Sequence, residues 1–220
     1  MCGRFTQISS PSNYAQLFST TTELTLASRF NVAPNSDIVA CRLTPGGNKE
    51  LVLLHWGLVP SWSKGLNNRY SMINARAETV ATKPAYRAPF RHHRCLIPAD
   101  GFYEWHAENG KQPYYIHRKN NSPLVFAGLW EHWDDDDGAH IESCTIIVCE
   151  ANSLMSPIHQ RMPVILRPAM YDSWLSNNNL DYLQSILISY AQDDLEMYPV
   201  SRAVNNPKND WPDLVDRLTQ

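Results

Sequence analysis

Short runs rich in apolar, β-branched and aromatic residues recur along this chain, and polar or turn-forming residues separate most of these runs. Runs of this kind, bounded by Pro, Gly or Asn, are typical of β-strands. The pattern predicts strands at residues 37–43, 50–56, 95–97, 101–105, 114–117, 124–130, 144–149 and 196–200.

Helical spacing of apolar positions is rarer and lies mostly at the two ends of the chain. It predicts helices over residues 12–18, 153–158, 169–176 and 180–191, the third of them preceded by a favourable helix-starting Pro168. Bunched strands with helices at the ends predict an α+β fold, with a mostly antiparallel, barrel-like β core and peripheral helices. At about 150 residues per domain, and with no linker or repeat, we expect residues 1–220 to form a single domain.

Composition places the chain among ordinary globular proteins. Hydrophobic residues make up 43% and charged residues 19%, which excludes a largely disordered chain. The sequence has neither a secretory signal nor a run of 18 apolar residues, so we expect a cytoplasmic protein. Five cysteines without a Cys-x-x-Cys pair argue against a disulfide framework and a zinc ribbon. We expect four of them to be reduced and buried.

Charge is unevenly distributed along the chain. The formal net charge is −3, yet residues 61–94 hold seven Lys or Arg side chains and one acidic residue, Glu78, which is a local charge of +6. Aromatic residues, including Trp62, interleave with these cations, as in grooves that track phosphates and stack bases. The alternative is a solvated Arg-rich face. Residues 134–137 are four aspartates that predict an exposed acidic turn, and a metal site is the less favoured interpretation.

Cys2 follows the initiator Met1, which cells commonly remove when the second residue is small. Cys2 would then carry an α-amine with a pKa of about 7.7–8.0, far more often neutral at pH 7 than a Lys amine. Such an amine attacks an aldehyde to form a Schiff base, and the neighbouring thiol can close on the same carbon to form a thiazolidine. We interpret Cys2 as an exposed aminothiol; the alternative is an incidental residue in a frayed terminus.

This chemistry needs proton donors and acceptors beside the aminothiol. Glu104 lies among aromatic residues that could desolvate its carboxyl, and His159 supplies an imidazole, a common group for proton transfer. Asn74 and Arg76 alternate along an extended segment, so they could hold a sugar hydroxyl and a phosphate from one face. Taken singly, each residue also fits a surface or structural role.

Seven motifs, taken together and in order, resemble the SOS response-associated peptidase family, whose members are also called abasic-site processing proteins. The resemblance runs from residue 2 to about residue 206, nearly the whole chain. The motifs are Met-Cys-Gly-Arg-Phe at 1–5, Arg-Phe-Asn-Val-Ala-Pro at 29–34, Trp-Gly-Leu-Val-Pro-Ser-Trp at 56–62, Ile-Asn-Ala-Arg-Ala-Glu-Thr at 73–79, Pro-Ala-Asp-Gly-Phe-Tyr-Glu-Trp at 98–105, His-Gln-Arg-Met-Pro at 159–163 and Pro-Val-Ser-Arg-Ala-Val-Asn at 199–205.

The resemblance implies a protein that binds single-stranded DNA, or a single-strand to double-strand junction, at an abasic site and shields it by a covalent thiazolidine crosslink. Lyase and autopeptidase activities are also implied, but less strongly. The resemblance implies no metal and no cofactor. The matching residues are the crosslinking Cys2, the acid–base residues Glu104 and His159, the sugar-orienting Asn74, the backbone-binding Arg4, Arg76 and Arg161, and Trp62 near the bound strand.

The segment 63–71 departs from the family pattern because it is longer and rich in Asn, which puts the role of Trp62 and a junction preference in doubt. Two other functions stay open. One is an N-terminal-nucleophile cysteine peptidase in which Cys2 attacks an amide with His159 as base. The other is a non-covalent single-strand binding module. We expect a monomer without membrane contact that is nucleoid-associated when bound to damaged DNA.

Overall fold

The computed structural model describes residues 2–21, 24–64, 72–106, 110–134, 138, 140–191 and 193–218. The strands are β1 (Phe5–Gln7), β2 (Arg29–Val32), β3 (Asp37–Leu43), β4 (Lys49–Trp56), β5 (Asn74–Arg76), β6 (Arg94–Ala99), β7 (Gly101–His106), β8 (Gln112–Arg118), β9 (Leu124–Asp134), β10 (His140–Glu150), β11 (Arg161–Pro163) and β12 (Leu195–Pro199). The helices are α1 (Pro11–Phe18), α2 (Arg87–His92), α3 (Tyr171–Ser176) and α4 (Leu180–Ser185).

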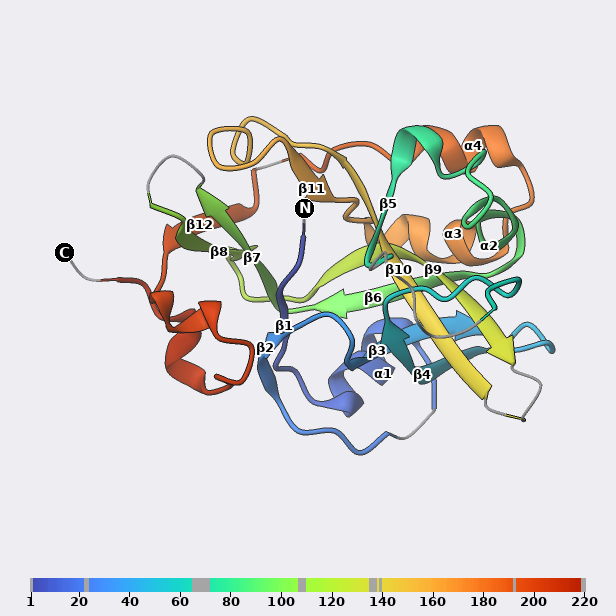
Figure 1. Cartoon of the computed structure of the whole chain (residues 1–220), viewed down its shortest axis with the longest axis horizontal. Coiled ribbons are helices and arrows are strands. Elements are labelled where there is room, and N and C mark those ends of the chain that lie inside the picture. The colour runs from blue at the N-terminus through green and yellow to red at the C-terminus, as the bar shows by residue number, and fades with distance from the viewer. Residues whose placement is uncertain are drawn as a thin grey trace.

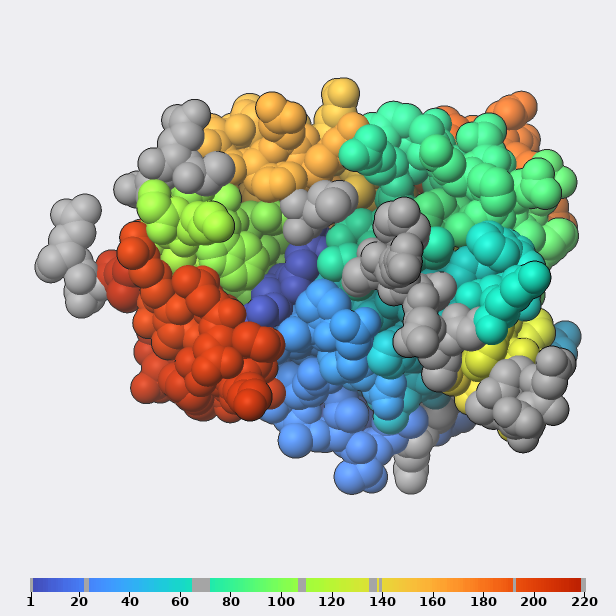
Figure 2. Space-filling view, in the orientation of Figure 1, coloured from blue at the N-terminus to red at the C-terminus, as the bar shows by residue number. Residues whose placement is uncertain are grey.

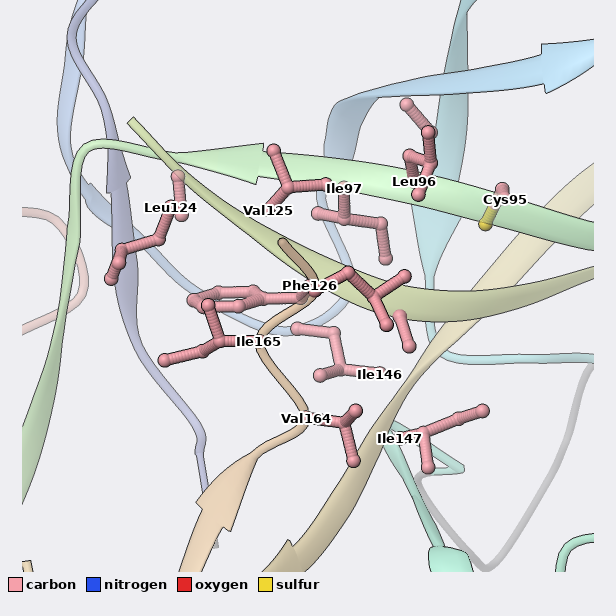
Figure 3. Packing of buried hydrophobic residues seen from close by; sticks show 14 of the residues in the cluster. Cys95, Leu96, Ile97, Leu124, Val125, Phe126, Ile146, Ile147, Val164 and Ile165 are labelled. Atoms are coloured by element: carbon pink, nitrogen blue, oxygen red, sulfur yellow. The ribbon is translucent and has the colours of Figure 1, made fainter. Parts of the chain in front are cut away.

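Five strands close into a barrel in the order β10, β4, β3, β6 and β9, with β9 pairing back onto β10. Most of these pairs are antiparallel, but β10 runs parallel to β4 and to the short β5. The interior holds branched and aromatic side chains such as Ile97, Phe126 and Ile146 (Figure 3), all of them fully buried. The α+β prediction with a barrel-like core is therefore confirmed.

A second, antiparallel sheet of β12, β8, β7, β1 and β2 lies beside the barrel (Figure 1). The buried side chain of Gln7 fastens the two together. Its amide nitrogen donates to the carbonyls of Val39 at 3.0 Å and Pro98 at 2.9 Å, and its oxygen accepts from Val39 N at 3.0 Å. Because these partners belong to two barrel strands, the start of the chain is fixed against the barrel wall.

Asp100, between β6 and β7, fixes the chain that leaves β1. Its Oδ2 accepts hydrogen bonds from Ile8 N at 2.6 Å, Ser9 N at 3.0 Å and the Tyr14 hydroxyl at 2.6 Å. A single carboxylate thus orients both the exit from β1 and the helix α1. This explains why an acidic residue stands between two buried strands.

Helices α2, α3 and α4 gather at one end of the barrel (Figure 1). Arg94 lies between α2 and α3 and is 5% exposed. Its guanidinium donates to carbonyls at the C-terminal ends of both helices, namely those of Phe90, Arg91, Trp174, Leu175 and Asn177. Cations stabilise helix C-termini because the last carbonyls there lack partners in the helix.

The predicted strands are all present; several are longer than predicted, and the last is shifted by one residue, to Leu195–Pro199. Three predicted helices differ. The helix predicted at 169–176 starts with a 3₁₀ turn over Pro168–Met170, and α3 begins only at Tyr171. Residues 153–158 form turns because Pro157 has no N–H to continue a helix. The last helix ends at Ser185 rather than 191, and Ile186 and Leu187 beyond it pack into the core. The longest described helix, α1, has eight residues, too few to span a bilayer.

Candidate active site

The first residues of the chain lie in a recess of the surface. In Figure 2 they are dark blue, between the green β7–β8 hairpin and the red C-terminal segment. Cys2 is fully buried, so the expectation of an exposed aminothiol is wrong. All five cysteines are free and buried, one more than the four we expected. Cys2 is buried because it packs within the larger cluster of buried hydrophobic side chains.

Pairing between β1 and β7 positions Glu104. Phe5 lies opposite Phe102, and Tyr103 N donates to Arg4 O at 3.0 Å. Continuing this register brings Glu104 level with the residue that follows Cys2. The Glu104 side chain is only 2% exposed. A buried carboxyl is thereby held next to the aminothiol of the chain start.

Burial decides the ionisation of both groups. It raises the pKa of the Cys2 thiol far above its ordinary value, and the charge of Glu104 raises that pKa further. Burial also raises the pKa of Glu104, while the charge of His159 acts in the opposite direction. The thiol is therefore neutral at pH 7, and the carboxyl takes up a proton more readily than an exposed glutamate.

Asn74 holds the backbone of Cys2. Its Nδ2 donates to Cys2 O at 2.9 Å, and the Tyr86 hydroxyl donates to Asn74 O at 3.3 Å. Parallel pairing with Ile146 in β10 places Asn74 at this point. Its Oδ1 is buried and has no hydrogen-bond partner among the residues that the structure describes. Arg76, two residues along β5, is exposed, whereas Ala75 between the two is buried.

His159 lies in the turn between β10 and β11. Its Nδ1 accepts a hydrogen bond from Arg161 N at 3.0 Å. The same Nδ1 lies 3.2 Å from Arg161 O, so the Arg161 backbone fixes the orientation of the imidazole ring. Because the charge of His159 acts on the Glu104 carboxyl, the two groups share one site. The structure thus brings together Cys2, Asn74, Glu104 and His159.

Two of the arginines expected at DNA already have partners in the protein. Arg4 Nη1 donates to Asn31 Oδ1 and to Val204 O, each at 2.9 Å. Arg161 pairs with the Glu78 carboxylate. Asn31 is a residue that sequence analysis missed, although it stands inside the motif at residues 29–34. It is 2% exposed and links Arg4 to the C-terminal segment.

The cationic segment 61–94 is only partly a surface feature. Trp62 is 64% exposed, and Lys64, Lys83, Arg87 and Arg91 are exposed as well. In contrast, Arg94 is buried by its helix-capping contacts, so it cannot add to the phosphate-binding face we expected. Phe90 is a core residue packed against Trp174 and cannot stack on bases. Arg69 and Tyr70 lie outside the described residues.

The aspartate-rich turn is described only at its start. Asp134, the last residue of β9, is exposed and contacts His140 Nδ1 at 2.6 Å. Residues 135–137 lie outside the described part of the chain. The predicted acidic turn, and the alternative metal site there, thus lie mostly outside the described residues.

The sequence profile of the SOS response associated peptidase (SRAP) family matches residues 1–207. The chain belongs to this family. It is 43% identical to the abasic site processing protein YoqW of Bacillus subtilis, over 98% of this chain and 99% of that protein. It is 32% identical to the abasic site processing protein HMCES of Xenopus tropicalis, over 76% of this chain and 57% of that protein.

A solved structure shows the same SRAP-type fold. The crystal structure of a protein from Bacteroides thetaiotaomicron superposes with a TM-score of 0.88 at 26% identity, over 99% of this chain and all of that one. Family membership, inferred above from seven motifs, is thereby confirmed.

Proposed function

We propose that this SRAP protein processes abasic sites in single-stranded DNA and captures them covalently through Cys2. The observation that carries the proposal is the convergence of Cys2, Asn74, Glu104 and His159 in one recess. An aminothiol, an amide, a carboxyl and an imidazole are the groups that thiazolidine formation requires. The names of the relatives, abasic site processing proteins, support the same reaction class.

The reaction begins with the closed deoxyribose hemiacetal. Glu104, with its raised pKa, donates a proton to the ring oxygen while the C1′ hydroxyl gives its proton to solvent, and the C1′–O4′ bond breaks to leave an aldehyde at C1′. After removal of Met1, the α-amine of Cys2 attacks C1′ to form a carbinolamine. Loss of water, assisted by Glu104 and His159, yields the Schiff base.

Ring closure follows on the same carbon. The Cys2 sulfur forms a bond to C1′, the C=N double bond becomes a single bond, and the thiol proton passes to the nitrogen. Because burial and Glu104 keep the thiol neutral, the amine reacts first and the thiol second. The same neutrality argues against the cysteine peptidase alternative, which needs a thiolate nucleophile.

Substrate contacts follow from the remaining polar groups. The buried Oδ1 of Asn74, unpaired among the described residues, accepts a hydrogen bond from a sugar hydroxyl. Arg76 contacts the flanking phosphates from its exposed position, and the exposed Trp62 stacks on a neighbouring base. Arg4 and Arg161 reach DNA from positions already fixed by protein contacts. Contacts of this kind select the missing base without reading sequence.

The finer assignments belong to the same proposal. Residues 1–220 act as one domain and as a monomer, in the cytoplasm and on the nucleoid when damaged DNA is bound. The same recess removes residues ahead of Cys2, and β-elimination from the Schiff base is its lyase side reaction. A junction between single-stranded and double-stranded DNA is a second substrate form.

The test is intact-mass spectrometry of the purified chain before and after mixing with single-stranded oligonucleotide that contains one abasic site. We expect loss of Met1 in the free protein and, after mixing, a denaturation-resistant adduct whose mass is the sum of both partners less one water. Cys2→Ser abolishes this adduct and keeps reversible DNA affinity. Glu104→Gln slows adduct formation more than it weakens binding.

The matched control is Cys41→Ala, which removes another fully buried thiol from a barrel strand outside the site. Its adduct yield should equal that of the unaltered chain. An adduct that persists in Cys2→Ser, or reversible binding without any adduct, contradicts the covalent mechanism. Catalytic turnover of peptides without a DNA adduct would favour the peptidase instead.

A further inference from the structure

A second group of titratable side chains lies outside the candidate active site, where the end of α2 meets β9. His93 is the C-cap residue that follows α2, and Glu131 and His132 are neighbours in β9. Glu131 Oε1 lies 3.2 Å from His93 Nδ1 and 3.5 Å from His132 Nδ1. Within 4.8 Å of one another, the three side chains each offer an atom that can ligate a metal.

These separations match the edges of a tetrahedral metal site. Zinc binds imidazole nitrogen and carboxylate oxygen at about 2.0–2.1 Å, so two ligands at the tetrahedral angle lie about 3.3–3.4 Å apart. The two measured edges, 3.2 and 3.5 Å, lie on either side of this value. An ion bound between the three side chains would therefore require little movement of Glu131 and His93.

Packing fixes two of the three ligands. Glu131 is 5% exposed, and its Oε1 also accepts a hydrogen bond from His132 N at 3.1 Å, which orients the carboxylate. The His93 ring stacks on Trp130 with 4.6 Å between ring centroids. His132 is the exposed member, with 49% of its side chain accessible to solvent.

Space for a further ligand adjoins the cluster. His93 and Trp130 line a cavity of about 440 Å³ that also contacts Arg42 and Glu142. The charge of Arg42 is balanced there by the carboxylates of Glu50 at 2.8 Å and Glu142 at 2.5 Å. The second arginine on this cavity, Arg94, is bonded to helix carbonyls, and His93 is the cluster member that the cavity contacts.

We propose that His93, Glu131 and His132 form a binding site for one divalent transition-metal ion, best suited to Zn²⁺, with its fourth ligand from solvent. Two imidazoles and one carboxylate select zinc and neighbouring first-row metals over Mg²⁺ and Ca²⁺, which take oxygen ligands. The ion takes no part in the chemistry at Cys2. It ties the end of α2 to the barrel strand β9 and so fastens the helix that carries the exposed Arg87 and Arg91.

The test is a Zn²⁺ titration of the full chain, stripped of metal with a chelator, against a chromophoric competitor. We expect one equivalent to bind. His132→Ala and His93→Gln should each weaken binding by at least about tenfold, since even loss of outer-sphere partners costs 10- to 100-fold. Because His132 is exposed, His132→Ala keeps the fold and remains decisive if His93→Gln does not. Co²⁺ should give the visible spectrum of a tetrahedral site.

Two variants serve as controls. His140→Ala removes an exposed histidine that pairs with Asp134 on the neighbouring strand, and its zinc affinity should equal that of the unaltered chain. Cys2→Ala removes the thiol of the candidate active site and should also leave affinity unchanged. The proposal is overturned if the unaltered chain binds no zinc, if Cys2→Ala abolishes binding, or if His93→Gln and His132→Ala both bind normally.

Discussion

The side chain of Asn31 joins three separate parts of the protein, and its replacement by Ala tests how the chain start is held. Its Nδ2 donates to the carbonyls of Val204 at 3.2 Å, Asn206 at 3.1 Å and Asn209 at 2.8 Å. Its Oδ1 accepts from Arg4 at 2.9 Å. One amide thus connects β2, the residues beside Cys2 and the C-terminal segment.

The expected loss follows from these contacts. Asn31→Ala removes all four hydrogen bonds, although Val204 O keeps its bond from Arg4. A buried polar group left without a partner costs about 1–3 kcal/mol. Water can reach the exposed Asn206, so the penalties do not add in full. We expect the free energy of unfolding to fall by about 2–4 kcal/mol.

Urea unfolding followed by tryptophan fluorescence measures this loss. The matched control is Asn209→Ala, which removes one hydrogen bond from Nδ2 to Ala203 O at 2.7 Å and should cost about 1 kcal/mol. Asn31→Ala should also slow adduct formation, because Arg4 and the adjoining Cys2 lose their support. A loss no larger than that of the control would refute the reasoning.

Three further predictions concern stability. Burial raises the pKa of Glu104, so the folded chain binds this proton more tightly than the unfolded chain does. The free energy of unfolding should therefore fall as pH rises from the unfolded pKa through the folded pKa. Urea unfolding at several pH values should show a smaller fall for Glu104→Gln, and parallel curves for the two proteins would contradict this prediction. Arg94→Met removes the hydrogen bonds to five helix-end carbonyls, so the free energy of unfolding, measured by thermal unfolding, should fall by at least about 3 kcal/mol. A smaller loss would show that water replaces the guanidinium. In Gly101→Ala the new Cβ would lie 2.3 Å from Tyr115 Cζ, so the free energy of unfolding should fall by about 1–3 kcal/mol. The control Gly46→Ala places its Cβ 3.7 Å from the nearest atom and should leave the free energy of unfolding nearly unchanged. Equal effects of the two substitutions would be inconsistent with a clash at Gly101.

The local sequence pattern was enough to predict the long strands and the fold class. The apolar run in the middle of β3, between polar or turn-forming residues, predicts its bounds, and four consecutive residues of this strand are buried. Strands β1, β5 and β11 have three residues each, too few for a periodic signal. They exist because partner strands supply their hydrogen bonds, which only the assembled sheets define.

For the candidate site, too, the sequence predicts some features and the tertiary structure decides others. The residue types at Cys2, Asn74, Glu104 and His159, and the family to which their motifs belong, were readable from the sequence; the roles of these residues remain predictions. Their convergence is a result of tertiary structure, because β1, β5, β7 and the turn after β10 meet only when the sheets pack.

The sequence by itself determined the order of the long strands, the family and the reactive groups, because these depend on side-chain type and short-range periodicity. The tertiary structure alone decided that Cys2 is buried and that Arg94 caps two helices rather than facing DNA. It also decided that His93 meets Glu131 and His132. Exposure and the partners of a charged group are set by segments distant in sequence, so no local pattern records them.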